Sequence, residues 1–400
     1  MTAIQDPPEI QESSHRWSER YPELGKEPLS VEPLVNEKYY ELEKERMWRK
    51  VWLNVGTVHH CPKPGDYFVQ PIKACNAEVL VMHGKDGKVR AFHNVCTHRG
   101  NKLIWDDRGS TKNYVSCSFH GWAFDLEGKL KSVLDEGSFY DIDRSCLGLT
   151  ELKTQVWRGF IFVTFNPDVE PLEDYLGPLV AEMEDRNFEG LHLNFRYEIR
   201  EDTNWKIAAD AQNEMYHVPV LGPVHSGIGF LYTHTPNGLA KTTVFERFGK
   251  HTLWGTGFNP EYVDKGLNAV LIPKAPLGDG GMPKRGGVFD YYHLFPNTVI
   301  AMLGDVTLVY NFWPEAVDHT VWKIDAYSPK PKTAADLLMA HFWRGKLRDI
   351  ISEDIAGHEA QHVGLASRFR PTFVVQDEEI AIRAFHKTMY TYVDPKEVEA

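Results

Sequence analysis

Two short segments of this 400-residue chain each place one cysteine and one histidine within a few residues of each other. The first reads Cys96-Thr-His98 and the second reads Cys117-Ser-Phe-His120. Two thiolates and two imidazoles suit either zinc or a [2Fe–2S] cluster in which two histidines replace two cysteines on one iron. Zinc sites more often pair cysteine with cysteine and histidine with histidine, whereas here each segment supplies one ligand of each kind. The arrangement therefore favours the cluster, with a structural zinc knuckle as the alternative.

The sequence around these pairs is typical of short antiparallel strands. From Trp52 to about Phe165, apolar and polar residues alternate in runs such as GDYFVQPI and GFIFVTF, which turn signals separate. One of these signals is Asp86-Gly87, a pair common in two-residue hairpin turns. We therefore predict a small antiparallel β domain over residues 52–165, with the Cys/His pairs in its loops.

The rest of the chain mixes helical and strand patterns. A helix is expected to begin at the N-cap Asn36, and longer helical patterns cover roughly Thr333–Ser367 and Asp377–Tyr392. Residues 171–225 also have helical character, whereas runs such as VTLVYNFWPEA and VWKIDAYSPK predict strands. These patterns predict an α+β fold, in which helices cover an antiparallel sheet and the β domain is inserted into the larger one. The expected divisions are 1–51 (an N-terminal arm and helix of the larger domain), 52–165 and 166–400.

The charge and cysteine content exclude several classes of protein. A net charge of −12 argues against nucleic acid or a membrane surface as a partner. No run reaches the ~18 apolar residues of a membrane span, and the N-terminus lacks the pattern of a signal peptide. Five cysteines are an odd number and do not suggest a disulfide framework, so we expect a cytoplasmic protein. Cys61, Cys75 and Cys146 are expected to be small buried residues.

The residues that flank the two Cys/His pairs resemble those of the Rieske domain in ring-hydroxylating and related oxygenases. They read NVCTHRGN from Asn94 and SCSFHGW from Ser116. Respiratory Rieske domains have an additional cysteine in each loop, near where this chain has Arg99 and Phe119. The chain is therefore similar to the terminal oxygenase component (α subunit) of Rieske non-haem iron oxygenases, whose larger domain is helix-grip-like. The resemblance implies four cluster ligands: Cys96, His98, Cys117 and His120.

A second segment resembles the family's signature for a mononuclear iron. It runs from Asn204 to His217 and reads NWKIAADAQNEMYH, and the resemblance makes His217 the first histidine ligand. The family usually has its second histidine four or five residues later, where this chain has Gly222. Two prolines in the interval prevent a regular helix. The three extra residues would then form a loop, which can bring a later histidine to the usual position of the ligand. We expect the second ligand to be His225, with His234 in reserve.

The third ligand of such an iron is a carboxylate, because iron(II) oxygenases use two histidines and one acid and leave positions open. The family pattern in the last long helix is an acidic pair followed by Glu and Gln, which Glu353-Asp354 and Glu359-Ala-Gln361 resemble. The resemblance implies that Asp354 is the ligand. Glu353 and Glu359 are expected to lie on a solvated face of the helix.

The resemblance also implies roles for two acids near His217. In the family, a carboxylate hydrogen-bonds an iron histidine of one subunit and a cluster histidine of the next, within a head-to-tail trimer. By position this residue is Glu214, where most of the family has Asp. Asp210 is expected to contact the metal ligands and hold them in place without binding the metal itself. A homotrimer is therefore the expected assembly.

The expected cofactors are the [2Fe–2S] cluster and one mononuclear Fe(II), with O₂ as co-substrate. Electrons come indirectly from NAD(P)H through a flavin reductase, a ferredoxin, or both. Basic residues near the cluster are candidates for docking an acidic electron donor or are simply solvated: Arg99, Lys102, Arg108 and Lys112.

The substrate is expected to be small, organic and largely apolar, and an aromatic compound is favoured. Residues 218–310 should line its pocket, and they contain many apolar residues and few charges. Within them, the Gly/Pro-rich residues 230–285 are long enough to be a functional loop. The chain length and Glu214 favour monohydroxylation or oxidative N- or O-dealkylation, for example of a herbicide-like N-alkyl compound. The alternatives are an aromatic-ring cis-dihydroxylating dioxygenase, a Rieske electron carrier and a zinc-stabilised binding module. A quaternary ammonium substrate would need an aromatic cage, which the Tyr and Trp content allows.

Overall fold

The computed structural model describes residues 16–186, 188–229, 239–257, 259, 289–303 and 306–398. His234 and most of the Gly/Pro-rich residues 230–285 lie outside these ranges, so the expectations for those residues stay predictions. Within the described part, Val244–Phe248 and His251–Thr256 form strands, so the expectation of one long loop is wrong there. Among the helices within these ranges, none is long and apolar enough to cross a membrane.

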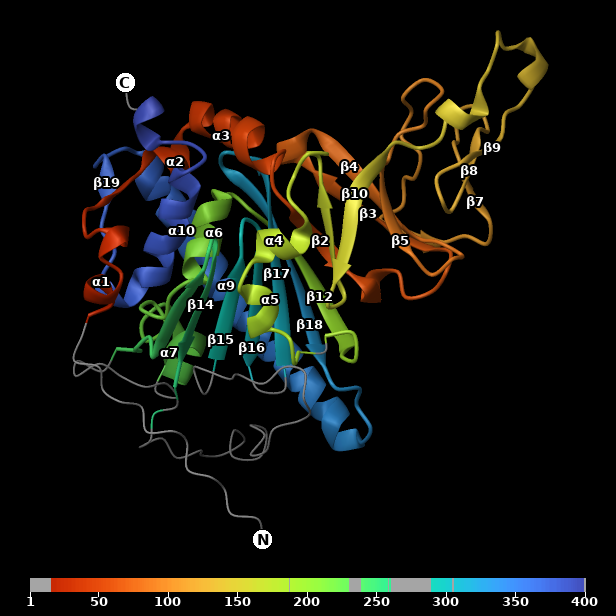
Figure 1. Ribbon diagram of the computed structural model, residues 1–400. Coiled ribbons are helices and arrows are strands. Elements are labelled where there is room, and N and C mark those ends of the chain that lie inside the picture. The colour runs from red at the N-terminus through yellow and green to blue at the C-terminus, as the bar shows by residue number, and fades with distance from the viewer. Residues whose placement is uncertain are drawn as a thin grey trace.

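Strands β2 to β11 form the antiparallel β domain that the alternating runs predict (Figure 1). Its main sheet has the order β2-β11-β10-β5-β4-β3-β6, and the three strands β7-β8-β9 form a second, smaller sheet. The strands are β2 (Leu53–Thr57), β3 (Asp66–Ile72), β4 (Ala77–His83), β5 (Val89–His93), β6 (Arg108–Ser110), β7 (Tyr114–Ser116), β8 (Ala123–Asp125), β9 (Leu130–Ser132), β10 (Glu151–Trp157) and β11 (Phe160–Thr164). The two Cys/His pairs lie in the connections β5–β6 and β7–β8.

The larger part of the chain is built on a second antiparallel sheet, with the order β12-β18-β17-β16-β15-β14-β13. Its strands are β12 (His192–Glu201), β13 (Val244–Phe248), β14 (His251–Thr256), β15 (Phe289–Leu294), β16 (Thr298–Leu303), β17 (Val306–Ala316) and β18 (His319–Ser328). A short pair, β1 (Leu29–Ser30) and β19 (Thr372–Phe373), joins the two ends of the chain. The expected α+β class is confirmed.

One strand of this sheet contradicts the expectation of helical character over residues 171–225. Strand β12 covers ten residues of that range and pairs along its whole length with β18. Apolar residues occupy alternate positions from Leu193 through Phe195 and Tyr197 to Ile199, which is the period of a strand. The period-two signal was therefore present, and Gly190, two residues before the strand, is a turn signal near its start.

The helices begin where capping residues allow. Asn36 accepts hydrogen bonds from the backbone amides of Lys38 and Tyr39, as expected of an N-cap. Thr333 caps the longest helix through a reciprocal pair of hydrogen bonds with Asp336. The helices are α1 (Trp17–Arg20), α2 (Glu32–Val35), α3 (Glu37–Glu43), α4 (Leu172–Leu176), α5 (Leu179–Glu182), α6 (Trp205–Ala211), α7 (Pro223–Gly229), α9 (Ala334–Ala366) and α10 (Ile380–Tyr390).

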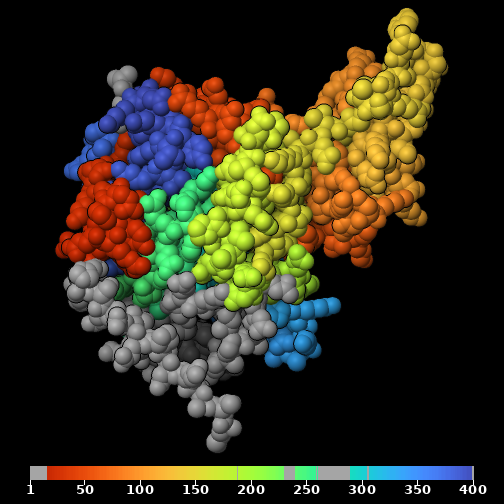
Figure 2. Space-filling model, viewed as in Figure 1, coloured from red at the N-terminus to blue at the C-terminus, as the bar shows by residue number. Residues whose placement is uncertain are grey.

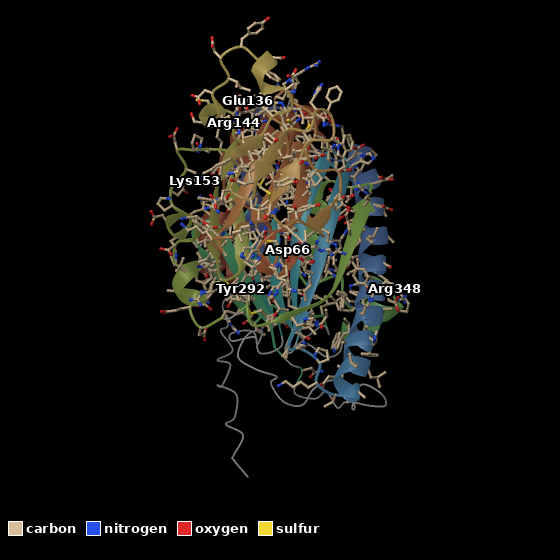
Figure 3. The ribbon with its side chains drawn as sticks, turned by 90° about the vertical axis from the view of Figure 1, so that its right-hand side faces the viewer. Asp66, Glu136, Arg144, Lys153, Tyr292 and Arg348 are labelled. Carbon is tan, nitrogen blue, oxygen red and sulfur yellow. The ribbon has the colours of Figure 1, made fainter. Side chains whose placement is uncertain are left out.

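The larger sheet lies between two layers, and alternate residues of β18 face each of them. Trp322 packs beside His358 of α9, with ring centroids 5.9 Å apart. Asp325 and Tyr327 point the other way, where Asp325 pairs with His60 of the β domain. Figure 3 shows α9 running along one side of the sheet, with the exposed Arg348 on the outer side of the helix. The β domain and α9 therefore lie on opposite faces of this sheet.

The N-terminal helices pack onto the larger domain. Lys206 of α6 donates hydrogen bonds to both carboxylate oxygens of Glu43 at the end of α3, at 2.7 and 2.9 Å. Both side chains are fully buried, so each charge depends on the other for compensation.

One end of the β domain projects well beyond the body of the molecule (Figure 2). Glu136 and Arg144 form an ion pair there, which can be followed in Figure 3. Cys146 lies in the same region and is exposed, so the expectation that it is buried is wrong, whereas Cys61 and Cys75 are buried. A surface loop can expose a thiol without any cost in packing.

Candidate metal centres

The two Cys/His loops of the β domain are built alike. The amide of Cys96 donates to the carbonyl of Asn101 at 2.8 Å, and the amide of Gly100 donates back to the carbonyl of Cys96 at 3.0 Å. The second loop repeats both contacts at the same distances, between Cys117 and residues 122 and 121. Gly100 and Gly121 both have a positive φ, 77° and 70°, which glycine adopts without strain. A glycine four residues after each cysteine is therefore part of the local signal.

These loops bring two thiols and two imidazoles together. The rings of His98 and His120 lie 4.7 Å apart, and the two cysteines are buried and close enough to interact. Burial raises the pKa of the Cys96 thiol, whereas at Cys117 hydrogen bonds from backbone amides and from Asn101 outweigh burial and lower the pKa. Asn101 Nδ2 donates to Cys117 Sγ at 3.5 Å. Trp122 stacks on His98 with ring centroids 4.8 Å apart. The donor set fits a Cys₂His₂-ligated [2Fe–2S] cluster.

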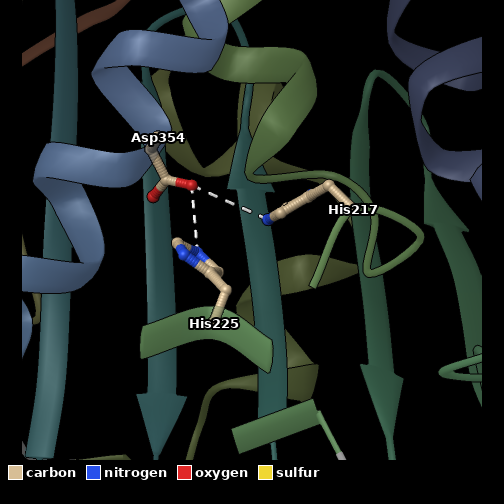
Figure 4. A group of neighbouring side chains, drawn as sticks. All are labelled: His217, His225 and Asp354. Carbon is tan, nitrogen blue, oxygen red and sulfur yellow. Dashed lines mark ion pairs between the residues drawn. The ribbon is translucent and has the colours of Figure 1, made fainter. Parts of the chain in front are cut away.

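A second convergence lies in the larger domain. His217 follows α6, His225 lies on α7 and Asp354 lies on α9, and Figure 4 shows the three side chains pointing at one another. Asp354 Oδ1 lies 3.1 Å from His225 Nε2 and 3.7 Å from His217 Nε2. The potential ligand atoms of all three residues lie within 4.8 Å of one another. Among the described residues, this is the one group of three or more such side chains that meets this spacing.

The hydrogen bonds around this group leave three electron-pair donors facing one point. His217 Nδ1 contacts the carboxylate of Glu214, and His225 Nδ1 contacts Glu353 at 2.8 Å. This pattern assigns the ring protons to the Nδ1 atoms, so that both Nε2 lone pairs face Asp354. Within the described part of the chain, Asp354 Oδ1 is buried without a hydrogen-bond partner. Such a site needs a cation, and two imidazoles with one carboxylate suit iron(II) with open positions.

The charges around His217 favour a positive charge at this place. Burial lowers the pKa of the ring, but the carboxylates of Glu214 and Asp354 outweigh it and raise the pKa to about 9. Burial likewise lowers the pKa of His225, and Asp354 and Glu353 raise it overall. A raised pKa means that each imidazole tends to bind an additional proton. A metal ion would take the place of that proton and compensate the charge of the same carboxylates.

Two domain families match the chain. Residues 51–140 match the Rieske [2Fe-2S] domain, and residues 188–394, more than half of the chain, match the catalytic domain of the ring-hydroxylating alpha subunit. The chain belongs to the ring-hydroxylating α-subunit family of Rieske oxygenases. The β domain is thus a Rieske domain, and the family accounts for both cofactors, the [2Fe–2S] cluster and a mononuclear iron.

Relatives of this Rieske α subunit include proteins of different specificity. The carnitine monooxygenase oxygenase subunit of Escherichia coli (strain K12) is 31% identical over 206 residues, which is 50% of this chain and 54% of that protein. The large oxygenase component of the naphthalene 1,2-dioxygenase system of Pseudomonas putida is 35% identical over 201 residues, 48% and 44% of the two chains. The chain therefore spans about half the length of the curated relatives it matches.

The fold is that of solved Rieske oxygenases. A crystal structure of a quaternary ammonium Rieske monooxygenase in complex with an inhibitor superposes with a TM-score of 0.75 at 21% identity. The match covers 91% of this chain and 94% of the other.

Glu353 does not lie on a solvated face, so that expectation is wrong. Its carboxylate accepts hydrogen bonds from the amides of Val224 and His225 and from the ring of His225. A helix pattern alone cannot reveal such a contact, because α7 reaches α9 only through tertiary packing. Glu359 is half-buried and accepts a hydrogen bond from the amide of Asp202 at 3.2 Å.

Asp210 makes a different contact from the one expected. It accepts a hydrogen bond from His386 Nε2 of α10 at 2.8 Å, and both side chains are buried. No contact between Asp210 and His217 or His225 is seen among the described residues, whereas Glu214 contacts His217 directly. Glu214 is therefore the acid that supports His217. Asp210 fixes α10 against α6.

The long helix contains one more motif that the sequence analysis did not single out, His358-Glu-Ala-Gln-His362. This spacing occurs in helical zinc sites. Here His358 Nδ1 contacts buried Glu201 of β12 at 2.8 Å, which ties α9 to the sheet one turn beyond Asp354. His358 and His362 do not belong to a group of three close ligands within the described ranges. An anchoring role accounts for His358.

Proposed function

We propose that this chain is a terminal oxygenase. It uses O₂ and electrons passed from NAD(P)H by a reductase or ferredoxin to oxidise a small, largely apolar organic substrate by monohydroxylation or oxidative dealkylation. The single observation that carries the proposal is the His217, His225 and Asp354 group in the same chain as the two-loop Cys/His site. An electron carrier needs the Cys/His site alone. A zinc module needs neither a cluster nor an iron with open positions.

The first test is the metal content. We expect about three irons and two acid-labile sulfides per chain, because the cluster takes two of each and the mononuclear site takes one iron. Iron and sulfide analysis with a visible spectrum of the brown protein measures this. One zinc per chain with no sulfide would overturn the proposal.

The choice between histidine ligands can be tested directly. His225→Ala should lose the mononuclear iron, because its Nε2 lies 3.1 Å from Asp354 Oδ1. His234→Ala should keep it, and both variants should keep the cluster spectrum. Iron analysis of the two proteins decides the matter, and loss of iron from His234→Ala alone would move the ligand to His234.

A specific observation favours a second candidate substrate, a quaternary ammonium compound. The rings of Trp254 and Tyr291 stack with centroids 4.5 Å apart. Burial and then the charge of Asp354 raise the pKa of Tyr291, and burial, then Tyr291 and Asp354, raise the pKa of Tyr310. Aromatic faces bind organic cations, and relatives of the chain are carnitine and glycine betaine monooxygenase subunits.

Products distinguish these reactions. Oxidative N-demethylation consumes O₂, two electrons and two protons, and yields the demethylated amine, formaldehyde and water. A cis-dihydroxylation instead puts both oxygen atoms into one ring. O₂ uptake with a surrogate reductase, measured on carnitine, glycine betaine, N-methylanilines and naphthalene, with formaldehyde and diol detection, separates them. Activity on naphthalene alone, with diol formation, would favour the dioxygenase alternative.

We also propose that the chain works as a homotrimer in which Glu214 carries electrons between subunits. The cluster loops lie at the far end of the molecule from α7 (Figure 1). The same end exposes aromatic side chains, Trp105 at 65% and Phe119 at 60%, which a second copy would cover. A related Rieske monooxygenase structure is described with inter-subunit electron transfer. Light scattering that gives a monomer at working concentration would contradict this assembly.

A further inference from the structure

Glu353 precedes Asp354 on α9, and successive residues of a helix point about 100° apart. While Asp354 points at the two histidines, Glu353 reaches the start of α7. Its Oε1 accepts from the amide of Val224 at 2.9 Å, and its Oε2 accepts from the amide and from Nδ1 of His225 at 2.9 and 2.8 Å. One carboxylate thus holds both the backbone and the ring of His225.

Gly222 leaves the space that this carboxylate occupies. A Cβ built on Gly222 would lie 2.4 Å from the carboxyl carbon of Glu353 and 2.5 Å from Oε1. No side chain fits there unless the carboxylate moves. Gly222 stands where the family usually has its second histidine, five residues after His217. The position of the Glu353 carboxylate therefore depends on a glycine at residue 222.

The contact between Glu353 and α7 can orient His225, which the spacing of the two histidines does not do by itself. The second histidine comes eight residues after the first, and the chain between them contains Pro219 and Pro223. A regular helix cannot carry both histidines across these prolines, so local structure alone does not orient His225. We propose that Glu353 is the positioning residue for His225, and that Gly222 is required because it admits the Glu353 carboxylate.

The physical effect is on the tautomer and on the direction of the ring. Glu353 accepts a hydrogen bond from the Nδ1–H of His225, so the proton stays on Nδ1 and the Nε2 lone pair faces Asp354, free to bind iron. The two amide contacts prevent the ring from swinging away with α7. Removing an acid that holds a metal histidine in this way typically lowers metal affinity about 10- to 100-fold.

A double-mutant cycle on iron binding tests the proposal. The proteins are wild type, Glu353→Ala, Gly222→Ala and the double variant. Each single variant should bind Fe(II) about 10- to 100-fold more weakly in competition with a chelator. In the Glu353→Ala background, Gly222→Ala should add less than about threefold, because the carboxylate that it displaces is already gone.

Two further variants separate positioning from folding. Glu353→Gln keeps the size but offers only one acceptor oxygen, so it should alter the EPR signal of the nitric oxide adduct of the bound iron. Glu359→Gln is the matched control on the same helix, because Glu359 also accepts a backbone amide but lies away from α7. It should bind iron like wild type. All variants should keep the cluster spectrum.

Three results would overturn the proposal. They are wild-type iron affinity in Glu353→Ala, an unchanged EPR signal in Glu353→Gln, or an equal cost of Gly222→Ala in both backgrounds. A wild-type protein that binds no mononuclear iron would instead contradict the proposed function, so the two failures are distinguishable.

Discussion

Replacing Asp354 with alanine will empty the mononuclear iron site and abolish substrate oxidation while the protein stays brown. Asp354 supplies the oxygen toward which both histidine Nε2 atoms point, and no other acid lies in that group within the described residues. Loss of a supporting acid costs about 10- to 100-fold in metal affinity, and loss of the ligand itself should cost more. The cluster should survive, because its loops are the β5–β6 and β7–β8 connections of the β domain, and α9 belongs to the larger domain.

The matched control for this variant is Asp349→Ala. Asp349 is a half-exposed acid on the same helix that, within the described ranges, forms an ion pair with its neighbour Arg348. Its removal should change stability by no more than about 0.5 kcal/mol and leave the iron in place. Iron analysis with the visible spectrum measures both results. A full complement of mononuclear iron in Asp354→Ala would show that another residue is the carboxylate ligand.

The second large effect is expected from Glu214→Gln, which should keep both metal centres but nearly abolish turnover driven by NAD(P)H. Glu214 contacts His217 Nδ1, and its other oxygen accepts the amides of Tyr216 and His217. Glutamine retains an acceptor for the ring, so iron remains bound. It loses the charge that, in the proposed trimer, would link this imidazole to a cluster histidine of the neighbouring subunit, and the rate of electron transfer should fall by about 100-fold or more.

Rapid-mixing kinetics can isolate this step. The cluster is first reduced chemically, and its reoxidation is then followed after O₂ and substrate are added. Glu379→Gln is the control. Burial and then the charges of Glu214 and Asp210 raise the pKa of Glu379 to about 7. The substitution therefore removes only part of a charge at neutral pH. This control should reoxidise at the wild-type rate. Wild-type reoxidation in Glu214→Gln would remove Glu214 from the electron path.

Much of the fold could be predicted from the sequence because its signals are local. The Asn36 and Thr333 caps, the strand runs of the β domain and the long last helix each depend on neighbours within a few residues. The Cys/His loops are of the same kind, because each one closes on itself through hydrogen bonds between residues four and five apart. Strand β12 was missed although its period-two pattern is equally local.

What only the tertiary structure decided is which distant groups meet. That His217, His225 and Asp354 converge could be expected from motif resemblance, but the excursion that brings His225 into place depends on α7 packing against α9. The partners of Glu353 and Asp210 are separated from them in sequence by 128 and 176 residues. A buried acid and a solvated acid look alike in a helical pattern, because exposure is set by what packs against the helix. The sequence alone therefore determined the chemistry available to this protein, and the packing of α7 on α9 and of α10 on α6 determined which acids serve His225 and His386.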